Sequence, residues 1–288
     1  IGKGEADFVE DIAAELPLQA IAEIMGVPQK DRHLLFKWSN DLIGVDDPEY
    51  EGDPGEAAME LYAYAHELAA DRGIDPQDDI ITKLVNAEID GDRLTELEID
   101  VFMLLLSVAG NETTRNATAH GMHALLTNPD QFTLLKSDVE KHLDTAVDEI
   151  IRWASPVLHF RRTTTEPTEL LGQEIEKGSR VVMWYISANR DEDVFTDPFV
   201  FDITRTPNDH IAFGGGGAHY CLGANLARAE LRLIFKEIAL RMPDMKMEGE
   251  PERLRSNFIG GIKHLPVSWT PGPRVDPPPY ERETRLIK

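Results

Sequence analysis

Apolar residues recur every three or four positions through most of the first half of the chain, which is the spacing of amphipathic helices. Three such helical stretches are predicted, at residues 8–24, 31–42 and 56–71. Gly26 and Pro28 provide stop signals after the first of them. The acidic segment 44–55 has no such periodicity and is predicted to be a loop. The pattern therefore indicates a protein whose first half is built mainly from helices.

The longest helix is predicted to run from about Thr95 to about Thr127, just before a proline. Thr95 and Glu98 have the spacing of a capping box at its start. At about 1.5 Å per residue such a helix spans roughly 45–50 Å and crosses a whole domain. We therefore expect its middle to be buried, although this middle carries the polar run 111–114, Asn-Glu-Thr-Thr.

The second half of the chain changes character after Pro156. A helix is predicted over 139–153, and the β-branched and aromatic segment that follows it reads as short strands. A last strong helix follows Cys221. These elements predict a fold that is mainly α with small β-sheets, formed by residues 1–270, and a proline-rich, charged tail at 271–288.

Composition narrows the class of protein. The chain of 288 residues is 42% hydrophobic and 28% charged, as in ordinary globular proteins. Its net charge of -23 argues against nucleic acid or an anionic membrane as a partner. There is no apolar run of transmembrane length and no signal-peptide pattern at the start, and a single cysteine excludes an internal disulfide. We therefore expect a cytoplasmic protein without a membrane span.

The segment from Phe213 to Gly223 carries the strongest indication of chemistry. Four glycines at 214–217 let the backbone approach a flat or bulky group, and Cys221 stands at the entrance to a helix. The positive end of a helix stabilises a thiolate, and a cysteine thiolate is one of the axial ligands that proteins offer haem iron. Three other interpretations stay open on this segment alone: an inert buried cysteine, a phosphate-binding loop and a cysteine hydrolase assisted by His219.

This segment resembles the haem-binding signature of the cytochrome P450 family, with one additional glycine between Phe213 and Cys221. Ala109-Gly110-Asn111-Glu112-Thr113-Thr114 is similar to the oxygen-activation segment of that family. Its physical logic is that Thr113 can bond to a carbonyl one turn earlier, Gly110 can relax the helix to open a groove, and a hydroxyl beside a carboxylate can relay protons. Two further motifs agree in order and spacing, namely Glu149-Ile150-Ile151-Arg152 with Arg205 of the segment 197–205, and Arg162.

The resemblance implies the C-terminal two-thirds of a cytochrome P450 fold with heme b, iron protoporphyrin IX, as cofactor. Cys221 would be the iron ligand, and Glu112 and Thr113 the catalytic residues. Arg162, or alternatively Arg161, and His219 would contact the haem propionates. The remaining cofactor contacts are predicted at Ala109, Gly110, Phe213 and Gly223. An apolar substrate wall is predicted at Leu105, Val108, Val157, Phe160 and Ile259, although each of these could equally be core.

The implied function is a monooxygenase that inserts one oxygen atom of O2 into a C–H bond. The segments AGNETTRNATAHGM, FGGGGAHYCLGANLAR and GIKHLPVSW are most similar in sequence to those of enzymes that hydroxylate the terminal carbon of sterol side chains or methyl-branched lipids. Terpenoid or alkane hydroxylases are alternatives, and a peroxygenase and a non-enzymatic haem sensor are alternative classes.

The resemblance also implies partners. Electrons would come from a ferredoxin and a ferredoxin reductase to a monomer, with Arg228 and Arg232 either contacting the carrier or forming a solvated helix face. Members of the family are longer at the front, so we expect the 288-residue chain to close its pocket incompletely and to retain haem poorly.

Overall fold

A computed structural model of the protein describes residues 2–273, so most of the predicted tail at 271–288 lies outside the described residues. The helices are α1 (Glu15–Met25), α2 (Arg32–Ile43), α3 (Pro54–Ile74), α4 (Ile80–Val85), α5 (Glu96–Thr127), α6 (Pro129–Ser137), α7 (Val139–Ala154), α8 (Tyr185–Ala188) and α9 (Ala224–Arg241), with a π-turn η1 (Val9–Ala13) and a 3-10 turn η2 (Gln29–Asp31). The strands are β1 (Glu5–Asp7), β2 (Glu88–Ile89), β3 (Asp92–Arg93), β4 (His159–Thr163), β5 (Thr168–Leu170), β6 (Gln173–Ile175), β7 (Arg180–Trp184), β8 (Lys246–Met247), β9 (Glu252–Arg253), β10 (Ile262–His264) and β11 (Pro266–Ser268). The prediction of a mainly helical protein with small sheets is confirmed.

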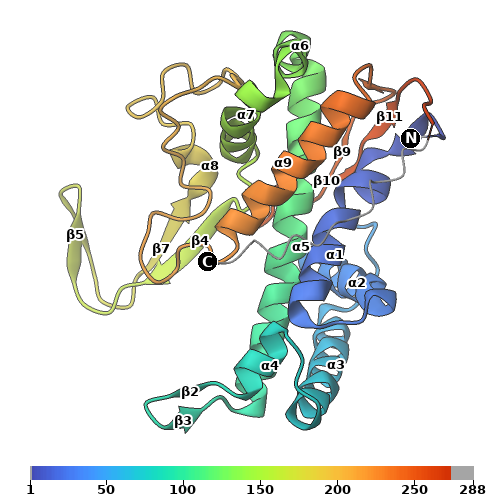
Figure 1. Ribbon diagram of the computed structural model, residues 1–288. Helices are drawn as coiled ribbons and strands as arrows, with labels where there is room; N and C mark the ends of the chain where they lie inside the picture. The colour runs from blue at the N-terminus through green and yellow to red at the C-terminus, as the bar shows by residue number, and fades with distance from the viewer. Residues whose placement is uncertain (1, 274–288) are drawn as a thin grey trace.

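Helix α5 is the axis of the molecule. It begins at the predicted capping box, in which the Thr95 hydroxyl accepts from the Glu98 N–H and the Glu98 carboxylate accepts from the Thr95 N–H. Figure 1 shows α1 to α4 along its first half and α6, α7 and α9 beside its second half. Each of the longer helices therefore contacts α5, which holds the two halves of the fold together.

The apolar core divides along this axis. One cluster joins α1, α2, α3 and α4 around Met103, and the other joins α5, α7 and α9 with the strands near the chain ends. Gly121 marks the closest approach in the second cluster, because an added Cβ would lie 2.6 Å from Ile150 and 2.7 Å from Phe235. Full burial of side chains of this size stabilises a fold by about 1.5–3 kcal/mol each, so these clusters dominate the stability of the protein.

The strands form small antiparallel sheets. Three strands pair in the order β1-β11-β8, with Ala6 opposite Val267, and this sheet brings the two ends of the described chain together. Strand β4 pairs with β7 with His159 opposite Trp184, and β2–β3, β5–β6 and β9–β10 are two-stranded pairs. Within residues 2–273 no helix is both long and apolar enough to cross a lipid bilayer.

The first predicted helix differs from the prediction at its start. Its first turn is the π-turn η1, in which the Ala14 N–H donates to the carbonyl of Val9, five residues earlier. Pro17 has no N–H and cannot donate to the carbonyl of Ala13, which interrupts the regular α-helical ladder there. Helices α4 and α6 and the hairpin β2–β3 were not predicted.

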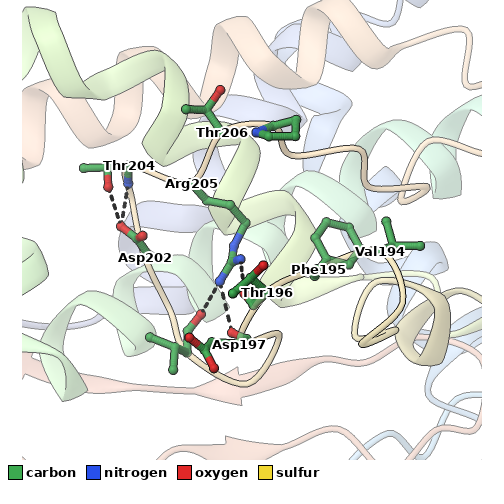
Figure 2. A pocket seen from close by; sticks show the side chains of 10 residues that line it. Val194, Phe195, Thr196, Asp197, Asp202, Thr204, Arg205 and Thr206 are labelled. Atoms are coloured by element: carbon green, nitrogen blue, oxygen red, sulfur yellow. Dashed lines mark hydrogen bonds between the residues drawn. The ribbon is translucent and has the colours of Figure 1, made fainter.

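A buried ion network ties α7 to the irregular segment 189–208. The Arg152 guanidinium donates twice to the Glu149 carboxylate at 2.8 Å, and both side chains are fully buried. Arg205 donates to the same carboxylate at 3.1 Å, as the sequence predicted. Figure 2 shows the Arg205 guanidinium reaching back into its own loop, where it donates to the carbonyls of Thr196, Asp197 and Val200. The network therefore fixes a loop that has no regular secondary structure.

Glu230 on α9 is buried without compensation. Its side chain is 4% exposed, and Oε2 has no hydrogen-bond partner among the described residues. Burial raises the pKa of this carboxyl from 4.5 to about 7. Because the folded pKa lies above the unfolded one, the folded state holds a proton that the unfolded chain releases, and stability is lost as the pH rises through 7.

We expect Glu230→Gln to stabilise the protein at pH 8 by about 1–3 kcal/mol, because it removes an uncompensated buried charge. At pH 5 the difference should nearly vanish, since the carboxyl is then neutral in the folded protein. Urea unfolding at both pH values measures the effect. Glu237→Gln, on the same helix but half-exposed, is the control and should show no such pH dependence. Equal pH dependence in the Glu230→Gln variant and the unaltered protein would contradict the assignment.

Candidate functional site

The cysteine loop is closed by its own backbone. The Cys221 N–H donates to the carbonyl of Phe213 at 2.9 Å, so the intervening residues form a compact bulge before α9. Gly214, Gly216 and Gly217 have φ of +94°, +103° and +78°, a region that favours glycine. A Cβ added at Gly216 or Gly217 would meet no atom of residues 2–273 within 4 Å. The glycines are therefore required by the backbone path, and the loop leaves open space beside it.

Cys221 lies three residues before the first residue of α9 and is partly buried. Burial raises the pKa of its thiol, although the Gly223 N–H and Arg228 act in the opposite direction. The sequence led us to expect that the helix end would favour the thiolate, but burial has the larger effect. A positive charge beside the sulfur would favour the thiolate, and a metal ion would supply one by displacing the thiol proton.

Exposed apolar side chains flank this cysteine in the sequence. Tyr220 and Leu222 on either side of it are 46% and 82% exposed. Helix α9 packs against α5, whose residues Leu105, Ala109 and Thr113, spaced four apart, form a face that remains accessible, with Leu105 57% exposed. Exposed apolar side chains of this size are a common feature of ligand or partner sites. A partly buried sulfur, an open glycine loop and an apolar helix face fit a flat, apolar, metal-containing group.

Thr113 has the predicted geometry. Its Oγ1 donates to the Ala109 carbonyl at 2.7 Å, one turn earlier, so the hydroxyl lies on the accessible face of α5. Gly110 does not. An added Cβ there would lie 2.7 Å from Ile21, so this glycine serves the close packing of α1 on an unbroken α5 rather than a relaxed groove. We therefore leave Gly110 out of the residues that could hold a cofactor.

Glu112 points away from Thr113. Its Oε2 accepts from Arg115 at 2.5 Å and lies 3.5 Å from the Asn116 amide nitrogen, and the side chain is 1% exposed. Burial raises the pKa of Glu112, against the opposing effects of Arg115 and Asn116. Arg115 in turn donates to Asn40 on α2 at 3.0 Å. The carboxylate and the hydroxyl expected to lie together are thus adjacent in sequence but have separate partners.

The two predicted propionate contacts are both accessible. Arg162 lies on the exposed strand β4, where its Nη1 donates to the Arg161 carbonyl at 3.0 Å. Because side chains alternate along a strand, Arg162 shares a face with Phe160, and Arg161 lies on the other face. His219 is exposed on the cysteine loop. Neither side chain is committed to an ion pair in the described structure, so both remain available to an anionic ligand.

The predicted apolar wall is partly assembled. Phe160, 39% exposed, lies 5.8 Å from the ring of Tyr185 and 5.7 Å from that of Phe258. Val157 is partly exposed and forms a backbone bridge with Ile259. Ile259 itself is 2% exposed, so its side chain belongs to the core, and the adjacent Phe258 is the side chain that reaches the wall. On α5, Val108 is partly exposed next to the face formed by Leu105.

The two arginines considered for a protein partner are already paired. Arg228 donates to Asp148 at 2.9 Å, and its guanidinium lies 4.6 Å from the centre of the Phe213 ring. Arg232 is ion-paired with Asp144. Both carboxylates belong to α7, so these arginines pair α9 with α7, and their side chains, 33% and 39% exposed, remain on a solvated helix face as the alternative interpretation expected.

Sequence reasoning noted Asn111 but missed the polar residues of α5 that follow it, namely Arg115, Asn116 and His120. Asn111 is fully buried, and neither atom of its side-chain amide has a partner among the described residues. Polar residues that return every four or five positions in an otherwise apolar helix are the signal that could have revealed this stripe.

Comparison with known proteins gives a consistent result. The sequence model of the family described as Cytochrome P450 matches residues 8–242. The steroid C26-monooxygenase of Mycolicibacterium smegmatis is 54% identical over 269 residues, which are 93% of this chain and 62% of that protein. The methyl-branched lipid omega-hydroxylase of Mycobacterium tuberculosis (strain ATCC 25618 / H37Rv) is 50% identical over 269 residues, 92% of this chain and 63% of that protein. The chain thus spans less than two-thirds of the length of these relatives.

Solved structures agree. A Mycobacterium marinum cytochrome P450 in complex with pseudoionone has a TM-score of 0.89 and 44% identity, covering 92% of this chain and 66% of that one. A Bacillus megaterium protein in complex with testosterone has a TM-score of 0.82 and 35% identity, covering 93% of this chain and 73% of that one.

Proposed function

Because the chain belongs to the cytochrome P450 family, we propose that it serves a haem-dependent monooxygenase that inserts one oxygen atom of O2 into a C–H bond of an apolar substrate. The observation that carries the proposal is the partly buried Cys221 behind an open glycine loop, just before α9, the helix that packs against α5. Haem, when bound, supplies the redox chemistry that cleaves O2, and the protein supplies the ligand, the proton route and the pocket.

Heme b is the proposed form of the cofactor, with Cys221 as the iron ligand. The Gly223 N–H, which lowers the pKa of the thiol, would donate a hydrogen bond to the ligating sulfur. The Phe213 carbonyl would keep the loop closed by accepting from the Cys221 N–H. Arg162 and His219 would bind the propionates, since an exposed guanidinium can form a charge-assisted contact with a carboxylate. Ala109, which has the smallest side chain of the accessible α5 face, would let the cofactor lie close to the helix.

The proposed substrate is a sterol side chain or a methyl-branched lipid, oxidised at its terminal carbon. Leu105, Val108, Val157 and Phe160 offer an apolar surface with few polar groups, which suits a long hydrocarbon. The names of the relatives, a steroid C26-monooxygenase and a methyl-branched lipid omega-hydroxylase, support this choice over a terpenoid or an alkane. A ferredoxin with its reductase is the proposed electron source, and the proposed state is a monomer.

We expect substrate titrations to separate these classes. A sterol and a methyl-branched fatty acid should shift the absorption spectrum of the haem-loaded protein at lower concentrations than a terpene of similar size does. The physical reason is that a long hydrocarbon buries more apolar surface against the accessible face of α5 and against Phe160, which makes its binding more favourable. Tighter binding of the terpene would replace the lipid assignment with the terpenoid one.

Thr113 and Glu112 are the proposed proton route to bound O2. The Thr113 hydroxyl holds its position through the Ala109 carbonyl, and the buried Glu112 is the nearest acid in the sequence. Because the two side chains have separate partners, transfer between them requires either a rotation of Glu112 or intervening water.

We expect Thr113→Ala to lower product formation on the order of 100-fold while reductant is still consumed and hydrogen peroxide is released. Peroxide and product per reductant oxidised are the measurements. Thr113→Ser keeps the hydroxyl and should retain most of the coupling. Unchanged turnover in Thr113→Ala would refute the relay, and peroxide-driven turnover of undiminished rate would favour a peroxygenase.

A further inference from the structure

The loop that carries Phe258 to the substrate wall is held by side chains of α5. The Ile262 N–H donates to Asn116 Oδ1 at 3.1 Å, and His120 Nε2 lies 3.0 Å from the Gly260 carbonyl. Asn116 and His120 are four residues apart, so they lie on the same face of the helix. Two hydrogen bonds from one rigid element thus define the position of residues 258–262.

We call Asn116 and His120 the clamp, and its surroundings are tightly packed. Asn116 is 1% exposed, and an added Cβ at Gly261 would lie only 3.0 Å from its Oδ1. Burial, together with Arg253, lowers the pKa of His120 to about 4, so the ring is neutral near pH 7. A carbonyl can only accept a hydrogen bond, and Nε2 must therefore carry the proton and donate to Gly260.

The other side of the loop is fastened to the wall itself. The Gly260 N–H donates to the Pro156 carbonyl and the Leu158 N–H donates to the Phe258 carbonyl, each at 2.9 Å. The Phe258 ring then lies 5.7 Å from Phe160. A shift of the loop relative to α5 would consequently move the wall that faces the substrate.

Asn116 also touches the acid of the proposed proton route. Its Nδ2 donates to the Glu112 carbonyl at 2.9 Å and lies 3.5 Å from Glu112 Oε2. His120 has no such contact with Glu112 in the described structure. The two clamp residues therefore differ in one respect, since only Asn116 joins the wall to the acid.

We propose that Asn116 and His120 are positioning residues that set which carbon of the substrate is oxidised, and that Asn116 also couples the wall loop 258–262 to Glu112. The proposal rests on the proposed monooxygenase function. Specificity would then be determined by residues of α5 that need not touch the substrate. A displacement of about 1 Å in a substrate-positioning group is enough to change the outcome of a reaction strongly.

The test uses the haem-loaded protein with cholesterol and a methyl-branched fatty acid, 15-methylhexadecanoic acid, as probes, and compares the distribution of hydroxylated products and the peroxide released per reductant. His120→Leu should shift the product distribution about fivefold towards carbons away from the chain end without raising the peroxide yield. His120→Gln should restore the distribution, since its amide nitrogen can replace Nε2 as the donor.

The Asn116 variants separate the two contacts. Asn116→Asp keeps an acceptor for the Ile262 N–H but loses the donor to Glu112, so it should keep the product distribution and raise the peroxide yield. Asn116→Leu loses both contacts and should change both measurements. Thr118→Val is the matched control, because Thr118 is equally buried on α5 but its hydroxyl, among the described residues, bonds only to the Thr114 carbonyl. It should change neither.

Hydrogen exchange of residues 258–262 provides a readout that needs no turnover. His120→Leu and Asn116→Leu should increase exchange there by about tenfold, whereas Thr118→Val should not. Unchanged product distribution and unchanged exchange in both leucine variants would overturn the proposal. If the unaltered protein oxidised neither probe, the proposed substrate class would fail, and the exchange measurement would still decide whether the clamp exists.

Discussion

Cys221→Ser is expected to abolish oxygen insertion and to remove the thiolate signature from the haem spectrum. Cys221 is the single cysteine of the sequence, so no other thiolate can take its place. A serine hydroxyl is a far weaker donor to iron, and it lacks the electron push that favours O–O cleavage. The long-wavelength band of the reduced carbon monoxide complex, which reports the thiolate, should therefore disappear. Difference spectra of the haem-loaded protein measure this directly.

The control for this variant is Leu222→Ala, at the neighbouring exposed residue. It should keep the long-wavelength band, because it removes apolar contact but leaves the sulfur in place. Serine is close to cysteine in size and should leave the closing bond from the residue 221 N–H to Phe213 intact. Far-ultraviolet circular dichroism should therefore be unchanged. A retained thiolate band in Cys221→Ser would instead assign the iron to another ligand.

The long helices could be predicted from sequence because their determinants are local. The start of α5 follows from the Thr95–Glu98 capping box, and its apolar spacing extends to the turn before Pro129. The short helix α4 could not be predicted, because two turns are too few to show a period. Its start depends on Asp79, whose carboxylate accepts from the Thr82 N–H and pairs with Arg72 on α3. That second contact is tertiary, and no local pattern reports it.

The candidate site divides in the same way. The cysteine loop was predictable, since its glycines and cysteine are consecutive and the backbone path they require is local. The direction of Glu112 was not, because it follows from Arg115 and, through it, from Asn40, which is 75 residues away from Arg115. The packing of Gly110 against Ile21 likewise exists only after α1 has docked on α5. Spacing thus located the residues of α5, whereas packing decided where they point.

Glu149→Gln is expected to destabilise the protein by about 3–5 kcal/mol, because it removes the negative charge of a buried ion network. The carboxylate accepts from Arg152, Arg205, Asn208 and the Asp202 N–H, and it is fully buried. A neutral amide would leave the guanidinium of Arg152, which is 0% exposed, without a counter-charge and would replace one acceptor by a donor.

The measurement is the free energy of unfolding in urea, with Glu140→Gln as the matched control. Glu140 also lies on α7 and pairs with Lys236 of α9, but its side chain is 68% exposed, so its loss should change stability by less than about 1 kcal/mol. The same substitution at two positions of one helix thus separates the effect of burial on stability from the effect of replacing glutamate by glutamine in a helix. Since the Glu149 network fixes the loop 189–208, proteolysis of the Glu149→Gln variant should begin in that loop. Equal stability of the two variants would show that the arginines find other partners.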